Sequence, residues 1–547
     1  MSDAARVRPI ADVADGLGIS RDHLQLYGDD KAKVALEARA GRPLSGRLVL
    51  VSAITPTDAG EGKTTTSIGL AQGLARIGQS VCLALREPSL GPTFGMKGGA
   101  TGGGAARVVP EADINLHFTG DFHAISASHN LLAAMLDNHL HQGNALDVDP
   151  RRVLWRRVID MNDRSLRNIV IGLGGAIDGV PRETGFDITP ASEVMAALCL
   201  AEDAEDLRRR LERIVVALTF ARERVTAAEL KAVGAMMVLL KDAIRPNLVQ
   251  TVDGVPALVH GGPFANIAHG CSSVIATKMA LAHADWAVTE AGFGFDLGAE
   301  KFFDIKCVSA GLDTAVVVLV ATVRALKLHG GAAKDALDTP DPAAVERGLG
   351  NLAKHVESIR AFCEPPVVAL NRFTADTEEE IEVVRRACAA LGAPFAVSEV
   401  FARGGEGGVE LAQAVVEHAE RKSKPFCPLY AWSDPVKVKM EKIARAMYGA
   451  REVGWSNDAE KDLAMIRRFG HEGLPLCVAK TQKSLSDDPK LLGRPEDFEI
   501  SVRNVILAAG AGYLVPLLGD IIRMPGLPAT PQAERLDLVD GRVVGMS

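Results

Sequence analysis

A short stretch near the N-terminus, residues 55–66 with the sequence TPTDAGEGKTTT, most strongly constrains how this chain can fold. An apolar run at residues 48–54 leads into it, and a helix-like segment at residues 67–77 follows it. A strand, a loop of small residues and a helix in this order direct backbone N–H groups and the positive end of the helix towards phosphate. The stretch therefore predicts a phosphate-binding loop (P-loop) within an α/β fold.

The stretch differs at one position from the common pattern G-x-x-x-x-G-K-[ST], because Thr57 stands where the first glycine is expected. Gly62, Lys63 and Thr64 fit the pattern, in which the lysine reaches the terminal phosphates and the hydroxyl ligates Mg²⁺. A glycine-rich turn with a surface lysine is the alternative, but the preceding strand and the following helix favour the P-loop. The residues predicted to bind ATP are Thr57, Asp58, Ala59, Gly60, Glu61, Gly62, Lys63, Thr64 and Thr65.

A second predicted strand, residues 80–85, follows the helix after Gly78. The two strands and the helix form a βαβ unit, which has a right-handed crossover and parallel strands. Loops at the carboxyl ends of parallel strands form the ligand crevice. If the two strands are close neighbours in the sheet, Arg86 and Glu87 lie near the P-loop. A surface arginine at a strand end is the alternative for Arg86.

Apolar runs further along the chain predict more strands of the same sheet. They lie at residues 286–290, 314–321 and 366–371, and an almost wholly apolar, valine-rich run is typical of a parallel strand buried on both faces. A chain of 547 residues is too long for one core. We therefore predict an α/β fold with a P-loop NTPase-like, mostly parallel sheet flanked by helices, and two further α/β domains. The predicted segments are 1–130 and 281–360 for the P-loop domain, whose residues 1–45 are helical, 131–280 for a mostly helical α/β domain, and 361–547 for a third α/β domain.

The strand at residues 286–290 ends in Glu290 and runs into a glycine-rich, acidic loop at residues 291–301. Carboxylates at the end of a parallel strand suit Mg²⁺ binding or a base near the phosphates. Solvated loop acids are the alternative, and the sequence leaves both open.

Charge and hydropathy argue against several classes of function. A net charge of −8, with no long run of lysine or arginine, argues against a general nucleic-acid-binding protein. The longest apolar runs reach at most about half of the roughly 20 residues that span a bilayer, so no membrane partner is expected. The first residues, MSDAAR, lack the apolar core of a signal peptide, and the eight cysteines form no C-x-x-C pair. These features predict a cytoplasmic protein with reduced thiols.

Two further segments have an unusual composition. Residues 95–106 are rich in glycine and form either a flexible linker or a backbone surface shaped around a ligand; Lys97 within them is an anion contact or a solvated lysine. Residues 111–141 are rich in histidine, but the spacing matches no known zinc pattern. Structural hydrogen bonds are the main interpretation, and one or two of these histidines near the P-loop could handle protons. The histidines are His117, His123, His129, His139 and His141.

Two phenylalanines follow predicted strands. Phe373 comes directly after the strand at residues 366–371, and Phe401 lies in the glycine-rich stretch 397–408. Exposed aromatic side chains on such loops can stack on a flat ligand, whereas a single phenylalanine is more often part of the core. Both interpretations stay open for each residue.

Several long and unusual blocks of this sequence are shared with a known family. One runs from residues 87–92 (EPSLGP) through the glycine run to residues 113–121 (DINLHFTGD), and another is residues 261–271 (GGPFANIAHGC). The loops around Phe293 and Phe401, residues 479–482 (AKTQ) and residues 524–528 (MPGLP) are further blocks. From about residue 45 to about residue 530 the chain resembles the formate–tetrahydrofolate ligase (10-formyltetrahydrofolate synthetase) family. Thr57 also matches that family's own pattern.

The resemblance implies an enzyme that converts formate, ATP and tetrahydrofolate into 10-formyltetrahydrofolate, ADP and phosphate through formyl phosphate. It implies that Lys63, with Mg²⁺ at Thr64 or Thr65, neutralises the phosphates. Arg86 resembles the family arginine that clamps formate and formyl phosphate, for which a planar fork is well suited. Glu87 beside it is implied to contribute to the family's monovalent-cation site, for K⁺ or NH₄⁺.

The same resemblance implies that Phe373 and Phe401 enclose the pterin and that Phe293 is a further active-site aromatic residue. The family often has tryptophan at the position of Phe401, so this chain offers a smaller stacking area. The implied partners are the small-molecule substrates, and the implied assembly is a homotetramer. No general base for the folate amine can be assigned.

Two rival interpretations use the same P-loop. One is another ATP-dependent ligase, resembling dethiobiotin synthetase, which predicts a shorter chain without folate-binding aromatic residues. The other is a P-loop switch ATPase that acts on a protein partner and needs a switch loop and a partner-binding helix. ADP release with ATP and formate, measured with and without tetrahydrofolate, separates the three.

Overall fold

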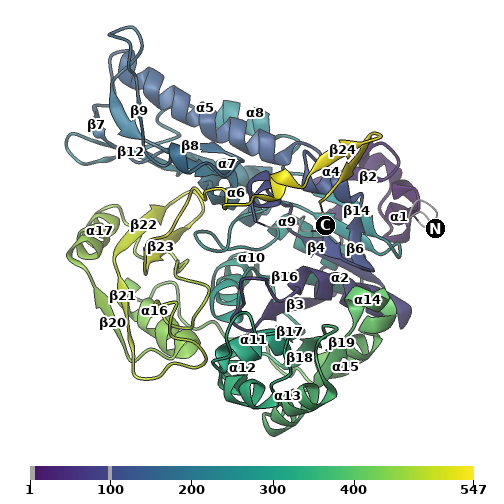
Figure 1. The fold of residues 1–547 in the computed structure, drawn as a ribbon. Helices are drawn as coiled ribbons and strands as arrows, with labels where there is room; N and C mark the ends of the chain where they lie inside the picture. Colours follow the sequence, from purple (N-terminus) through teal and green to yellow (C-terminus); the bar gives the residue numbers. More distant parts are fainter. Residues whose placement is uncertain (1–6, 97–100, 547) are drawn as a thin grey trace.

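The computed structural model describes residues 7–96 and 101–546. Its centre is a twelve-stranded sheet with the strand order β1-β2-β14-β15-β4-β16-β3-β17-β18-β19, to which β6 is joined through β14 and β5 through β6 (Figure 1). The strands are β1 Leu24–Tyr27, β2 Lys31–Val34, β3 Arg47–Ala53, β4 Val81–Leu85, β5 Gly102–Gly103, β6 Ala106–Val109, β14 Asn247–Thr251, β15 Pro256–Val259, β16 Trp286–Glu290, β17 Val316–Ala321, β18 Pro366–Asn371 and β19 Phe395–Ser398.

From β15 to β19 every pair of neighbouring strands is parallel, whereas the pairs at the β1 edge are antiparallel. The apolar runs predicted as strands form β16, β17 and β18, and these strands are buried along their whole length. Parallel strands need crossovers that place helices on both faces, which is why these runs are continuously apolar. The prediction of an α/β fold with a mostly parallel sheet flanked by helices is confirmed.

Helices cover both faces of the sheet because successive residues of a strand point to opposite sides. Along β3, Val49 and Val51 belong to a core that includes α2 (Lys63–Arg76) and α15 (Val409–Ala419). Leu48 and Leu50 belong to a second core that includes α9 (Val274–His283), α11 (Val323–His329) and α12 (Pro342–Ala361). The P-loop strand is therefore held rigidly between two helical layers.

The two strands of the first βαβ unit, β3 and β4, are not direct neighbours in the sheet. β3 pairs with β16 and β17, and β4 pairs with β15 and β16, so β16 lies between the two strands of the unit. Arg86 and Glu87, which follow β4, are thus one strand removed from the P-loop. Glu290, the last residue of β16, occupies the position between them.

The prediction that residues 1–45 are helical is wrong, because α1 (Ile10–Gly16) is followed by the strands β1 and β2. Each strand has only four residues, which is too short for an alternating pattern to stand out. Lys33 in β2 hides the pattern further, since this fully buried lysine lies 2.7 Å from the carboxylate of Asp121, which neutralises its charge.

The sheet also takes strands from all three predicted segments. β14 and β15 come from residues 131–280, and β18 and β19 come from residues 361–547. The edges of the sheet therefore do not coincide with the predicted boundaries, and the division into three domains stays a prediction.

Two groups of elements lie outside the sheet (Figure 1). The first contains the long helix α5 (Asp121–His141), α8 (Val233–Leu240), a small sheet of β7 (Val148–Val153), β12 (Val215–Thr219) and β13 (Arg224–Thr226), and the pair β9 (Ile169–Ile171) and β10 (Arg182–Thr184). The second contains α16 (Val436–Ile443), α17 (Asn457–Arg468), β20 (Glu452–Trp455), β21 (Glu499–Val502), β22 (Asn504–Ala508) and β23 (Tyr513–Leu517). The chain then returns across the molecule to the hairpin β24 (Asp537–Val539) and β25 (Arg542–Val544). In the described part of the chain, no helix has both the length and the apolar character needed to cross a membrane.

Two carboxyl groups are buried where the sheet meets the C-terminal group of elements. Glu300 and Asp304 lie one helical turn apart, and Asp304 Oδ1 accepts a 2.9 Å hydrogen bond from the backbone N–H of Leu429. Burial raises the pKa of Asp304 to about 8, and burial together with the charge of Asp304 raises the pKa of Glu300 well above its ordinary range. The folded protein therefore keeps protons that the unfolded chain releases above about pH 4.

This pair predicts that stability falls as pH rises. Because the native state binds more protons than the unfolded state between about pH 4 and pH 8, its share of the unfolding free energy declines across that window. The double variant Glu300→Gln/Asp304→Asn, whose amides imitate the protonated groups, should show a smaller decrease in melting temperature between pH 5.5 and pH 8.5. Calorimetry measures this, with Glu382→Gln, a side chain 54% exposed, as the control. An unchanged decrease in the double variant would show that other groups set the pH dependence.

Candidate active site

The loop after β3 is held closed by a buried carboxylate. Glu61, which is 2% exposed, accepts a 2.6 Å hydrogen bond from the backbone N–H of Thr57 and another from the hydroxyl of Thr322 at the end of β17. Thr57 stands where the common pattern has glycine, and its bond to Glu61 closes the loop at that position. α2 begins at Lys63, directly after the loop.

Gly62 gives the loop its close approach to the neighbouring strand β18. Its φ is +73°, in the left-handed region that favours glycine. A Cβ added there would lie 2.5 Å from the side-chain amide nitrogen of Asn371, which donates a 3.1 Å hydrogen bond to the carbonyl of Glu61. Gly60 has a similar φ of +78°, but a Cβ there would meet nothing within 4 Å.

Gly62→Ala and Gly60→Ala therefore form a matched pair. Both variants carry the cost of a positive φ, about 1 kcal/mol, but only Gly62→Ala displaces the Asn371 amide from Glu61. Because the sequence predicts that this loop binds ATP, we expect Gly62→Ala to raise the KM for ATP by about ten-fold more than Gly60→Ala does, in a steady-state assay of ADP formation. Equal effects of the two substitutions would contradict the proposed contact.

Glu290 connects the P-loop to Arg86. It is 3% exposed and accepts a 2.8 Å hydrogen bond from the hydroxyl of Thr64, while its other oxygen lies 3.6 Å from a terminal nitrogen of Arg86. The strand register explains this position, because Glu290 pairs with Val51 of β3 and β16 lies beside β4. The sequence indicated an acid at this strand end but did not include Glu290 among the predicted site residues.

Arg86 is only partly satisfied by these contacts. Its side chain is 26% exposed, and its Nε is buried without a hydrogen-bond partner. One of its terminal nitrogens lies 3.3 Å from where a Cβ on Gly292 would stand, so this glycine leaves room for the guanidinium. The interpretation of Arg86 as a surface arginine does not fit this position.

Glu87 points to the other side of the strand end. It is 4% exposed, its Oε2 has no hydrogen-bond partner, and the charged groups that act on it are Asp121, Lys33 and Asp160. Burial raises the pKa of Glu87 well above its ordinary range, the charge of Asp121 raises it further, and Lys33 lowers it. The structure thus places Arg86 near the P-loop and Glu87 in a separate acidic environment.

The loop at residues 261–271 packs against the loop after β16. The backbone N–H of Gly292 donates to the carbonyl of Gly270 at 3.0 Å, and Cys271 and Ala291 form an isolated bridge. Phe293 follows with a φ of +59°, an uncommon conformation for a bulky residue and a form of strain that clusters at functional sites. Asn266 Oδ1 and both ring nitrogens of His269 are buried without partners in this region. Only the sequence block itself indicated these two residues.

Phe373 and Phe401 follow neighbouring strands, since Asn371 of β18 pairs with Ser398 of β19. The guanidinium of Arg324 lies 4.5 Å from the ring centre of Phe373. Phe401, in α14 (Val400–Arg403), is 60% exposed. The two side chains therefore come from adjacent loops at the same edge of the sheet as the P-loop.

The C-terminal group of elements also reaches the P-loop. Asp58 lies 2.7 Å from the ammonium groups of both Lys334 and Lys483, and hydrogen bonds from Lys334 and then Lys483 lower its pKa. Nearby, the fully buried Lys480 lies 2.9 Å from Asp296. Of these three lysines, only Lys480 lies within the sequence block at residues 479–482.

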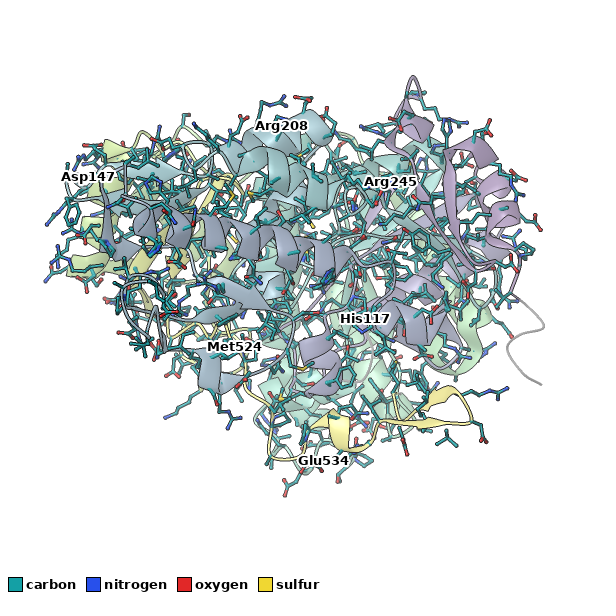
Figure 2. The ribbon with its side chains drawn as sticks, turned by 90° about the horizontal axis from the view of Figure 1, so that it is seen from above. His117, Asp147, Arg208, Arg245, Met524 and Glu534 are labelled. Atoms are coloured by element: carbon teal, nitrogen blue, oxygen red, sulfur yellow. The ribbon has the colours of Figure 1, made fainter. Side chains whose placement is uncertain are left out.

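Of the histidines in residues 111–141, four are spread along α5 and His117 precedes this helix, so they are not gathered at one point. His117 lies near the start of this helix and Asp147 beyond its end (Figure 2), and a helix of 21 residues is about 30 Å long. His129 has structural partners, because its nitrogens lie 2.8 Å from the Ser192 hydroxyl and 2.9 Å from the carbonyl of Arg156. Among the described residues no group of three or more histidine, cysteine and acidic side chains is arranged to hold a metal ion. Lys97 lies outside the described residues.

The fold is that of an α/β protein in which the loop between β3 and α2, Arg86 and the segments that carry Phe373 and Phe401 all follow strands at the carboxyl edge of a mostly parallel sheet. The family model for formate–tetrahydrofolate ligase matches residues 1–547, the whole chain. The chain therefore belongs to the formate–tetrahydrofolate ligase family, whose enzymes join formate to tetrahydrofolate in one-carbon metabolism.

Proposed function

We propose that this enzyme uses ATP to activate formate as formyl phosphate and then transfers the formyl group to tetrahydrofolate. A formate oxygen attacks the γ-phosphorus and ADP leaves; the folate amine next attacks the formyl carbon, the bond to phosphate breaks, and the amine loses its proton. The products are 10-formyltetrahydrofolate, ADP and phosphate. The observation that carries the proposal is the bridge formed by Glu290 between Thr64 of the P-loop and Arg86.

Phosphoryl transfer depends mainly on positioning and charge neutralisation. In this proposal Lys63 and the backbone of residues 57–65 bind the phosphates of ATP. Thr64 is the favoured Mg²⁺ ligand, because its hydroxyl lies 2.8 Å from the Glu290 carboxylate and hard oxygen donors suit this ion. Thr65 is the second candidate. Bound Mg²⁺ would supply positive charge against the phosphate oxygens.

Arg86 is proposed to hold formate and then formyl phosphate. A guanidinium fork binds planar carboxylates and phosphates through paired hydrogen bonds. Its buried Nε without a partner and its 26% exposure support a group that completes its bonding with a ligand. Phe293, beside Gly292, is proposed to border the same space.

Phe373 and Phe401 are proposed to enclose the pterin ring. Their origin on adjacent loops and the 60% exposure of Phe401 support this role. The smaller ring of phenylalanine, compared with tryptophan, predicts a reduced stacking area on the Phe401 side.

Glu87 is proposed to contribute to a site for K⁺ or NH₄⁺. Its partnerless Oε2 and the neighbouring Asp121 would supply buried oxygen ligands, and a cation there would relieve the repulsion between the two carboxyl groups. The proposed cation therefore lies on the side of the β4 end that Glu87 faces, and not beside the phosphates.

A homotetramer is also part of the proposal. The hairpin of β9 and β10 carries apolar side chains that face solvent, namely Val170 at 57%, Leu173 at 67% and Ile177 at 87% exposure. Exposed apolar side chains gathered on one hairpin are typical of an interface between chains.

The test is the complete reaction with purified enzyme. ADP and 10-formyltetrahydrofolate are measured with ATP, formate and tetrahydrofolate, and with each substrate omitted in turn. We expect both products in equal amounts and only when all three substrates are present. ADP without 10-formyltetrahydrofolate would overturn the proposal and favour a ligase for another acceptor, while ATP hydrolysis that ignores formate would favour a switch ATPase.

A further inference from the structure

Thr55, at the start of the loop between β3 and α2, is fully buried, and its hydroxyl and both its backbone groups have partners. Its N–H donates a 3.2 Å hydrogen bond to the side-chain oxygen of Asn351, and its hydroxyl accepts a 3.0 Å hydrogen bond from the amide nitrogen of the same side chain. Its carbonyl oxygen lies 2.9 Å from Nε2 of His329, and its hydroxyl lies 3.0 Å from Nε2 of His355. Three side chains therefore fix the start of the loop.

Two helices carry these three side chains. Asn351 and His355 lie four residues apart on α12, so they share one side of that helix, and His329 is the last residue of α11. Asn351 and His355 are fully buried, and His329 is 6% exposed. Because an unpaired polar group is costly in such a buried place, the hydrogen bonds hold Thr55 in one position.

Two of the same side chains also bind Gly493, in the segment between α17 and β21. The N–H of Gly493 donates a 3.1 Å hydrogen bond to Nδ1 of His329, and its carbonyl accepts a 2.8 Å hydrogen bond from the amide nitrogen of Asn351. Asn351 thus donates both to Thr55 and to Gly493. A distant part of the chain is therefore connected to the start of the loop through two buried side chains.

The partners of His329 define its protonation. A carbonyl only accepts, so Nε2 carries the hydrogen, and a backbone N–H only donates, so Nδ1 carries none. Burial lowers the pKa of His329 below its ordinary value and lowers the pKa of His355 to about 4. Both rings are therefore neutral at neutral pH, and the connection stays formed there.

The segment around Gly493 has two further contacts, both at the surface. Arg494 donates two 2.8 Å hydrogen bonds to Glu357 and thereby holds the segment against α12. Lys483 lies 2.7 Å from Asp58 of the loop, but these two side chains are 47% and 54% exposed, and such ion pairs contribute little to stability. The buried connection therefore imposes the main constraint on the loop.

We propose that the segment at Gly493 sets the conformation in which the loop between β3 and α2 binds nucleotide. The positioning residues are Thr55, Asn351, His329 and His355. They act through residues 57–65, so the inference rests on the proposed function, in which those residues bind ATP. A displacement of Thr55 moves the loop relative to the N-terminus of α2, which changes the affinity for ATP and leaves the affinities for formate and tetrahydrofolate unchanged.

Gly493→Ala and Gly470→Ala form a matched pair for the first test. Both glycines follow α17 and have a similar φ, +72° and +74°, but only a Cβ on Gly493 would lie close to another group, 3.0 Å from the carbonyl oxygen of His329. Titration calorimetry with ATP and Mg²⁺ should show about ten-fold weaker binding in Gly493→Ala and binding within about two-fold of the parent in Gly470→Ala.

The second test removes the hydroxyl of Thr55. Thr55→Val keeps the shape of the side chain and should raise the KM for ATP about ten-fold, while the KM values for formate and tetrahydrofolate change by less than about two-fold. Thr55→Ser, which keeps the hydroxyl, should behave like the parent. Thr314→Val is the control, because it removes a buried 2.8 Å hydrogen bond to Glu364 just before β17 begins, at the opposite edge of the sheet. It should lower the melting temperature without changing the KM for ATP.

Melting curves identify the variants that are folded at the assay temperature, and either Gly493→Ala or Thr55→Val decides the question if the other does not fold. Parent-like affinity for ATP in a folded variant, or equal weakening in Gly493→Ala and Gly470→Ala, overturns the inference. If the parent binds ATP but forms no 10-formyltetrahydrofolate, the proposed function is overturned, and the titration still decides the inference. A parent that binds no ATP overturns both.

Discussion

Replacing Lys63 with methionine should reduce the rate of ADP formation by on the order of a thousand-fold, which corresponds to about 4 kcal/mol of transition-state stabilisation. Lys63 is the first residue of α2, directly after the loop that Glu61 holds closed. Its backbone therefore lies at the helix N-terminus, where the N–H groups of the loop and of the first helical turn converge. Methionine keeps most of the length of the side chain and removes only its charge.

The measurement is a steady-state assay of ADP and 10-formyltetrahydrofolate with saturating formate and tetrahydrofolate. Lys334→Met is the matched control, because Lys334 also lies beside the loop but pairs with Asp58 at its outer side, with 69% of its side chain exposed. Asp58 keeps Lys483 as a partner in that variant, so we expect activity within about three-fold of the parent. Similar losses in the two variants would mean that the general positive charge around the loop matters, and that Lys63 has no special position.

The parts of the fold that follow from local pattern could be predicted from the sequence. Three strands are continuous apolar runs because they are buried on both faces, namely β16, β17 and β18. Their composition alone therefore indicates that they are buried strands. The loop between β3 and α2 could be predicted for a similar local reason, since Gly60 and Gly62 both have a positive φ there. β1 and β2 could not, because their four-residue length and the buried Lys33 depend on the distant Asp121.

The assembly of the site depends on strand order, which local pattern does not contain. Whether Arg86 reaches the P-loop is decided by β16, which lies between β3 and β4 and carries Glu290 to the point between them. The sequence indicated both residues but not their contact. Likewise, adjacent residues at a strand end point to opposite sides, so Arg86 and Glu87 enter different environments although they are neighbours in the chain. The roles proposed for these residues come from the resemblance to a family and not from local pattern.

Arg86→Ala should lower kcat/KM for formate by on the order of a thousand-fold, because a positioned arginine that neutralises a transferring phosphoryl group contributes several kcal/mol. Arg86→Lys should recover only a small part of this loss, since an ammonium restores the charge but not the paired hydrogen bonds of the fork. Arg151→Ala, which removes a side chain 79% exposed on β7, serves as the control and should behave like the parent.

The structure also predicts how the Arg86 variant differs from the Lys63 variant. Glu290 keeps its 2.8 Å hydrogen bond from Thr64 when Arg86 is absent, so the phosphate-binding side of the site stays intact. The KM for ATP should therefore change by no more than about three-fold in Arg86→Ala while the formate-dependent rate collapses. In Lys63→Met, in contrast, the affinity for the nucleotide and the turnover rate should both decrease. If Arg86→Ala instead keeps turnover within a few-fold of the parent, Arg86 does not hold the formyl group, and its 3.6 Å contact with Glu290 serves only to orient that carboxylate.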